Sequence, residues 1–109
     1  MDPTPIAVPS ALTALDPAAV AALRDARIAL EQIGGLDERS IELVRFGALI
    51  ALGAAEESIR AHVERARAIG MADEEVWGAV LSVATLVGVP RLIQVVPLVR
   101  AALESTPRS

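Results

Sequence analysis

Apolar residues recur along this chain every three to four positions, which is the period of amphipathic helices. The first helix is predicted in LDPAAVAALRDARIALEQIGG, where Asp16 acts as the N-cap and Pro17 takes the first helical position. Gly34 and Gly35 end this helix. Its inward stripe is expected to consist of Val20, Leu23, the stem of Arg27, Leu30 and Ile33.

A second helix is predicted in LDERSIELVRFGALIALG, which Asp37 caps and which is apolar on nearly every side over residues 46–52. A helix that is apolar all round is buried or lies between subunits. The third helix is expected over about residues 55–69, ending at Gly70. Its charged residues are expected to form one solvated face with i,i+4 ion pairs: Glu56, Arg60, Glu64 and Arg67.

The fourth helix, in EEVWGAVLSVATLVG, has acids at its N-terminus, where the helix dipole favours them, and then an apolar body. We expect it to be the central helix. The fifth, in VPRLIQVVPLVRAALE, opens near Pro90, and Pro97 should kink or split it by removing an internal hydrogen bond. Alternating strand patterns are lacking, so the sequence predicts an all-α, single-domain bundle of about five main helices.

The 109 residues correspond to one domain. Residues 1–15 are expected to form an extended N-terminal arm, because Pro3, Pro5 and Pro9 fix the backbone and remove hydrogen-bond donors. Residues 16–104 then form the helical domain. Residues 105–109, STPRS, are expected to be a disordered tail.

Composition changes this picture, because 53% of the residues are hydrophobic and only 2% are aromatic. A domain this small cannot hide so much aliphatic surface within one chain. We therefore expect a homo-oligomer whose helices pack across subunits. The single tryptophan, Trp77, is expected at a subunit contact, or alternatively in a pocket with Phe46.

The formal net charge is −4, so the chain lacks the basic face that binds nucleic-acid phosphates, and we expect no nucleic-acid partner. Its N-terminus, MDPTPIAVPS, does not have the basic and apolar segments of a signal peptide. The longest strongly apolar stretch, residues 76–89, is too short to span a bilayer. These features predict a cytoplasmic protein without membrane contact.

Candidate chemistry centres on AAEESIRAHV, which contains the only histidine. His62 shares a largely apolar helix face with Ser58, which precedes it by one turn. Two interpretations stay open: His62 is a core or interface histidine satisfied by hydrogen bonds, or it is a partly buried imidazole for proton transfer near neutral pH. A nucleophilic Ser58 is not expected, because nothing indicates an oxyanion hole. No metal site is expected, because one histidine without acids on its face is thin support for one.

The stretch IELVRFGALIALGAAEESIRAHVERARAIGMADEEVWGAVLSVATLVGVPRLI resembles the carboxymuconolactone decarboxylase family, which includes the alkylhydroperoxidase D proteins. The resemblance covers roughly residues 36–104. The redox members carry C-x-x-C-x-x-x-H, and only its histidine is present here, as His62, while Ala55 and Ser58 stand at the cysteine positions. Thiol peroxidase chemistry needs thiols, so this activity is not expected.

The resemblance implies a lyase or isomerase that needs no cofactor and acts on a small carboxylated lactone or related acid, with His62 as general acid/base. Glu42 in IELV matches the glutamate of the proton relay in the redox members, although one more residue separates it from the first cysteine position. Glu42 then either faces His62 or is a surface acid paired with Arg39 or Arg45. The family's assemblies are trimers, or hexamers built from them.

Arg45, one turn after Glu42, is a candidate clamp for an anionic substrate, or simply the partner of Glu42. We take Ser58 and Arg45 as candidate substrate-binding residues beside the catalytic candidates His62 and Glu42. The alternative to an enzyme is a catalytically degenerate oligomer that binds small molecules or serves as a scaffold.

Overall fold

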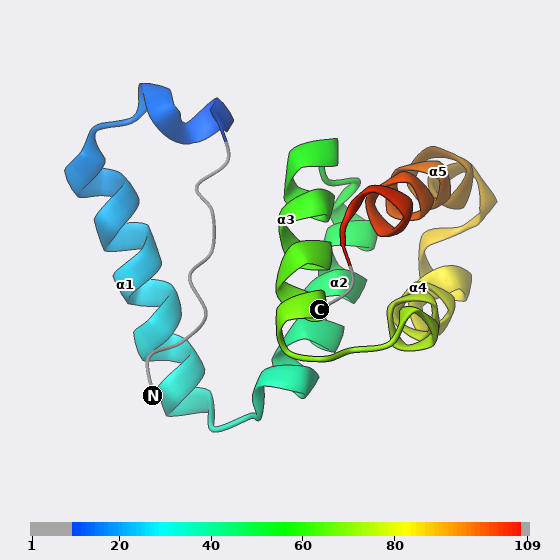
Figure 1. Cartoon of the computed structure of the whole chain (residues 1–109), viewed down its shortest axis with the longest axis horizontal. Helices are drawn as coiled ribbons and strands as arrows, with labels where there is room; N and C mark the ends of the chain where they lie inside the picture. Colours follow the sequence, from blue (N-terminus) through cyan, green and yellow to red (C-terminus); the bar gives the residue numbers. More distant parts are fainter. Residues whose placement is uncertain (1–9, 108–109) are drawn as a thin grey trace.

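The structure is a computed structural model that describes residues 10–107 (Figure 1). A short 3-10 helix, Ser10–Ala14, precedes five α-helices. These are α1 (Pro17–Gly34), α2 (Glu38–Leu52), α3 (Glu56–Ala68), α4 (Asp73–Val87) and α5 (Val89–Ser105). No strand occurs in residues 10–107, which confirms the all-α prediction.

The two predicted end segments lie partly outside the described residues. Residues 1–9 of the predicted arm are not described, and its described end contains the 3-10 helix rather than extended chain. Of the predicted tail, Ser105 still belongs to α5 and Thr106 is buried, whereas residues 108–109 lie outside the described range.

The first two helices begin at the capping residues that the sequence indicates. The backbone N–H of Ala18 donates to Asp16 Oδ1 at 2.8 Å, and that of Ser40 donates to Asp37 Oδ1 at 2.7 Å. These bonds satisfy N–H groups that the first helical turn leaves without partners. The hydrogen bond from Ser40 also lowers the pKa of Asp37.

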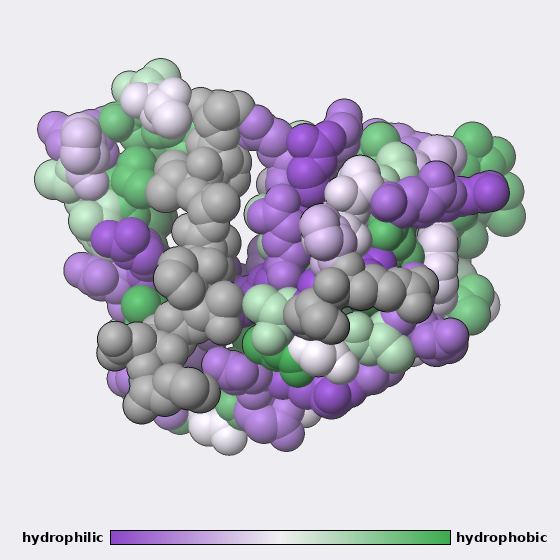
Figure 2. Space-filling view, viewed as in Figure 1, coloured by the Kyte–Doolittle hydropathy of each residue, from purple (hydrophilic) through white to green (hydrophobic). Residues whose placement is uncertain are grey.

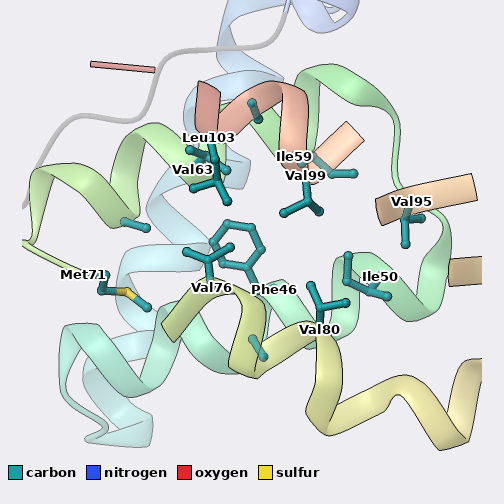
Figure 3. Close-up of a cluster of buried hydrophobic side chains, with 13 residues drawn as sticks. Phe46, Ile50, Ile59, Val63, Met71, Val76, Val80, Val95, Val99 and Leu103 are labelled. Atoms are coloured by element: carbon teal, nitrogen blue, oxygen red, sulfur yellow. The ribbon is translucent and has the colours of Figure 1, made fainter. Parts of the chain in front are cut away.

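The apolar core lies between four of the helices, of which α2 and α5 each contact the other three, whereas α4 packs against α2 and α5. The prediction that the fourth helix is central is therefore wrong. Phe46 of α2 is fully buried and projects into the middle of the cluster in Figure 3. Side chains from the other three helices surround it: Ile59, Val63, Val76, Val80, Val95, Val99 and Leu103.

Helix α5 continues through Pro97 to Ser105, so the proline does not split it. Proline lacks the N–H that would bond the carbonyl four residues earlier. That carbonyl belongs to Ile93, and both Pro97 and Ile93 are exposed. Water can therefore satisfy the freed carbonyl, and the helix tolerates the loss.

Helix α1 stands beside the bundle rather than within it (Figure 1), and none of its residues is buried. The predicted inward stripe is wrong for this chain: Leu30 is 67% exposed, Ile33 is 81% exposed, and Leu23 is also exposed. Of the predicted stripe, Arg27 does face α2: it and Glu31 are half-buried and engaged in ion pairs.

Apolar side chains are unusually frequent on the surface, and Figure 2 shows them gathered over α1 and near the junction of α4 and α5. The large exposed ones are Leu12, Leu15, Leu23, Leu30, Ile33, Leu36, Val44, Leu52, Leu81, Leu86, Val89 and Ile93. Within residues 10–107, no helix has the length and apolar character needed to cross a membrane.

Candidate functional site

Glu42 of α2 and His62 of α3 face each other between two adjacent helices. The Glu42 side chain is 0% exposed, and its Oε2 lies 3.0 Å from Nδ1 of His62, which is 13% exposed. The alternative of a surface Glu42 paired with Arg39 or Arg45 is wrong, because those arginines pair with Glu75 and Glu31, respectively. An ionised carboxylate only accepts hydrogen bonds, so Nδ1 is the donor when Glu42 is charged.

The turn between α2 and α3 brings these two residues together. Gly53 ends α2 in a left-handed conformation with φ of 66°, a backbone geometry that glycine adopts without steric cost. The Gly53 N–H donates to the Ile50 carbonyl at 3.2 Å, and the next N–H, of Ala54, donates to the Leu49 carbonyl at 3.0 Å. The chain thus reverses at once, and α3 runs back along α2 with His62 opposite Glu42.

Phe46 supports the imidazole from the core side. It follows Glu42 by one helical turn, and its ring meets that of His62 edge to face, with centroids 6.2 Å apart and planes at 74°. Such a contact is a favourable aromatic arrangement. The imidazole therefore has a carboxylate on one edge and a packed ring beside it, which limits its rotation.

Two arginines contact the other oxygen of Glu42. Arg65 Nε lies 2.7 Å from Oε1, and Arg27 Nη2 donates to the same oxygen at 3.5 Å. Arg65 is only 6% exposed, whereas Arg27 reaches in from α1. Arg65 was not among the residues predicted from the sequence, although its position three residues after His62 places it on the same helix face.

A second carboxylate, Glu31 of α1, extends this group of ion pairs. Glu31 Oε2 accepts a hydrogen bond from Arg27 Nε at 2.8 Å and another from Arg45 Nη2 at 3.0 Å. Partial burial opposes ionisation of Glu31, but the hydrogen bond and charge of Arg27, with the charges of Arg45 and Arg65, outweigh it and lower the pKa of Glu31. With three arginines and two glutamates, the cluster has a net charge of +1 when His62 is neutral.

The two candidate substrate-binding residues lie at the margin of this cluster. Arg45 contacts Glu31 rather than Glu42, and it lines an open groove of about 360 Å³ between α1 and α2 together with Leu30, Leu36 and other apolar residues. Ser58 is half-buried, and no hydrogen bond links it to His62 in the described part of the chain. The roles of both residues in substrate binding stay predictions.

Arg67 is also placed differently from the sequence-based expectation. It is buried rather than part of a solvated face, and it donates to the Leu103 carbonyl at 2.9 Å while Asp73 Oδ1 lies 3.0 Å away. It thus connects the end of α3 to α4 and α5. The rest of that face is solvated as expected, with Glu56 and Arg60 paired on the surface.

A larger open groove, about 650 Å³, lies between α2 and α4 and is lined mainly by small and apolar residues, including Gly47, Ala48 and Val83. In residues 10–107, no group of three or more His, Cys, Asp or Glu side chains is arranged to hold a metal ion.

The sequence model of the carboxymuconolactone decarboxylase family matches residues 17–101, a range that includes every residue of the Glu42–His62 cluster. No curated protein and no solved structure gives a significant match.

Proposed function

Because this chain belongs to the carboxymuconolactone decarboxylase family, we propose that it is a lyase or isomerase that acts on a small carboxylated lactone or related acid without a cofactor. The observation that supports this proposal most directly is the contact between buried Glu42 and His62. A histidine oriented by a carboxylate is a common arrangement for general acid/base catalysis, because its unperturbed pKa of about 6.5 suits proton transfer near neutral pH.

In the proposed decarboxylation, the bond between a ring carbon and its carboxylate breaks, CO2 leaves, and the electron pair forms an enolate. His62, first protonated by solvent on Nε2 so that both ring nitrogens carry a proton, keeps its Nδ1–H toward Glu42 and donates the Nε2 proton to that carbon, and water restores that proton for the next cycle. In an isomerisation, Nε2 would instead remove a proton from one carbon and return it to another. Either reaction uses the same imidazole and the same orienting carboxylate.

The arginines of the cluster support an acidic substrate. A net positive cluster favours the approach of a carboxylate, and arginine binds carboxylates with two parallel hydrogen bonds. Arg45 is the proposed clamp, because it is the most exposed arginine of the cluster and lines a groove. Thiol peroxidase activity is not expected, because the sequence contains no cysteine to act as the nucleophile.

We also propose that the protein works as a homo-oligomer, a trimer or a hexamer. The support is the aliphatic surface of α1, which buries no residue against its own chain and exposes Leu23, Leu30 and Ile33. A surface of this kind indicates a protein–protein contact. Sedimentation velocity should show an assembly of three or six chains, and a stable monomer at micromolar concentration would contradict this proposal.

The activity is tested by incubating the purified protein with a panel of carboxylated lactones and following CO2 release and product formation by NMR. His62→Gln should abolish turnover while leaving helix content and assembly unchanged. Arg60→Gln, a surface change on the same helix, is the matched control and should retain activity. If the wild type binds panel members by calorimetry but turns none over, the protein is a binding module instead.

A further inference from the structure

We propose that Arg65 is a positioning residue, which supplies the counter-charge for the Glu42 carboxylate and thereby holds His62 in the tautomer with its proton on Nδ1. Nε2 then carries the lone pair in the resting protein. The inference rests on the proposed function only for its catalytic meaning, namely that Nε2 is the nitrogen that exchanges protons with the substrate, as a base in the isomerisation and, once protonated by solvent, as an acid in the decarboxylation. Its structural content stands on the contacts of Arg65 and can be tested without substrate.

The burial of Glu42 requires a counter-charge. A carboxylate that is removed from water needs compensating charge and hydrogen bonds, and Glu42 is 0% exposed. Arg65, 6% exposed and 2.7 Å away, is the nearer and more deeply buried cation. Arg27 is 3.5 Å away and already holds Glu31 at 2.8 Å, so its charge is shared between two carboxylates.

The contact with Arg65 also fixes the orientation of the Glu42 carboxylate. Arg65 holds Oε1, and because a carboxylate is planar, fixing one oxygen aims the other, Oε2, at His62 Nδ1. The partner of one ring nitrogen decides which nitrogen of a neutral histidine carries the proton. A charged Glu42 can only accept, so the proton lies on Nδ1.

Removal of Arg65 would leave Glu42 with a weaker counter-charge. The groups that face Glu42 are then Arg27 from α1 and His62 from α3, and a buried carboxylate with a weaker counter-charge favours its protonated form. A protonated Glu42 would donate to Nδ1, which would move the imidazole proton to Nε2. That nitrogen could no longer accept a proton from a substrate. Arg65 therefore acts on the reaction through Glu42 without contacting the substrate.

The experiment uses the single histidine of the chain, which makes the ring signals unambiguous. The full chain is labelled with 15N-histidine, and the ring nitrogens are recorded by long-range 1H–15N NMR at a pH where the imidazole is neutral. The wild type should show a protonated Nδ1 and a bare Nε2. Arg65→Met should shift most of the population to the other tautomer, whereas Arg65→Lys, which keeps the charge, should resemble the wild type.

Arg60→Met, which removes an exposed arginine from the same helix, is the control and should leave the spectrum unchanged. A folded Arg65→Met variant with the wild-type ring spectrum would overturn the inference. If that variant does not fold, Arg65→Gln replaces it, and identical spectra for Arg65→Gln and Arg65→Lys would overturn the inference equally. Because no substrate is present, a protein without lyase activity could still show the tautomer change, so the two proposals fail separately.

Discussion

Arginine–glutamate pairs hold two regions of this molecule, the interior between α2 and α3 and the face between α1 and α2. In the interior, Glu42 and Arg65 are both buried and lie beside the apolar core that Phe46 centres. On the α1 face, Glu31 and Arg45 are partly open to solvent, and α1 contributes no buried residue. The same chemistry therefore supplements packing in one region and largely replaces it in the other.

This difference matters because the two regions should respond to different perturbations. Apolar packing depends little on moderate changes in salt or pH. Exposed ion pairs weaken when the salt concentration rises and when acid protonates their carboxylates. We expect α1 to separate from the bundle under conditions that leave the α2–α3 interior intact.

The largest effect is expected from Phe46→Ala, which leaves a cavity at the centre of the core. Truncation of a buried phenylalanine costs about 3 to 5 kcal/mol of unfolding free energy. Urea denaturation at one fixed protein concentration measures this loss. Leu30→Ala on exposed α1 is the comparison, and its loss should be much smaller in the dissociated chain. Equal losses would mean that α1 is packed as tightly as the core.

A smaller loss is expected from Arg67→Met, because this buried arginine bonds the Leu103 carbonyl and pairs with Asp73. Hydrogen bonds of charged groups contribute about 1.5 to 3 kcal/mol each to stability. Arg100→Met, which removes an exposed arginine paired with Glu104, should change the unfolding free energy far less. Thermal and urea unfolding of the two variants would show whether burial decides the effect.

Acid should act on α1 first. The pKa of Glu31 is lowered from its ordinary value of 4.5, so its ion pairs stabilise the folded state above that pH. The contribution is lost as the pH falls through the lower, folded-state pKa. Glu31→Gln should flatten this part of the stability curve between neutral and acidic pH. An unchanged curve would show that Glu31 does not tie α1 to the bundle.

A high salt concentration should have a still smaller effect on stability, and this effect should be confined to α1. At about 1 M salt the screening length is roughly 3 Å, which weakens partly exposed pairs much more than buried ones. Amide hydrogen exchange should therefore become faster in α1, while the amides of α2 and α3 keep their protection. Uniform acceleration, or none at all, would contradict the contrast between the two regions.

The smallest effect is expected from Arg60→Gln, which removes a solvent-exposed i,i+4 pair with Glu56. Such pairs contribute about 0.2 to 0.5 kcal/mol. The change should lie near the precision of a urea titration, and a loss above about 1 kcal/mol would show that this surface pair is stronger than exposed pairs usually are.

The helices and their ends could be predicted from the sequence, because those signals are local. Asp16, Asp37 and Gly35 act on backbone groups within a few residues, and each does so here as expected. The family resemblance likewise identified His62 and Glu42 as partners, but the added residue left their contact open. Whether Glu42 and His62 touch depends on the turn at Gly53. The conformation of that turn depends on long-range packing of α2 against α3.

Features that depend on packing between helices were harder to predict. Arg65 and Arg67 are charged, and the sequence gives no direct sign that Glu42 or the Leu103 carbonyl would lie close enough to bury them. The stripe of Leu23, Leu30 and Ile33 has the correct helical period, but periodicity does not say whether the partner is the same chain or another. A single sequence therefore predicts the helices more reliably than the contacts between them.

Gly53 shows how strongly the geometry of the cluster depends on a position without any side chain. A Cβ atom at this position would lie 1.7 Å from Arg91 Nη1, and although that guanidinium could swing aside, the left-handed φ would stay strained for most other residues. Relief of that strain would rotate α3 against α2 and alter the reach between carboxylate and imidazole. The distance between the Glu42 carboxylate and the His62 imidazole therefore depends on the lack of a Cβ atom at Gly53, nine residues before His62.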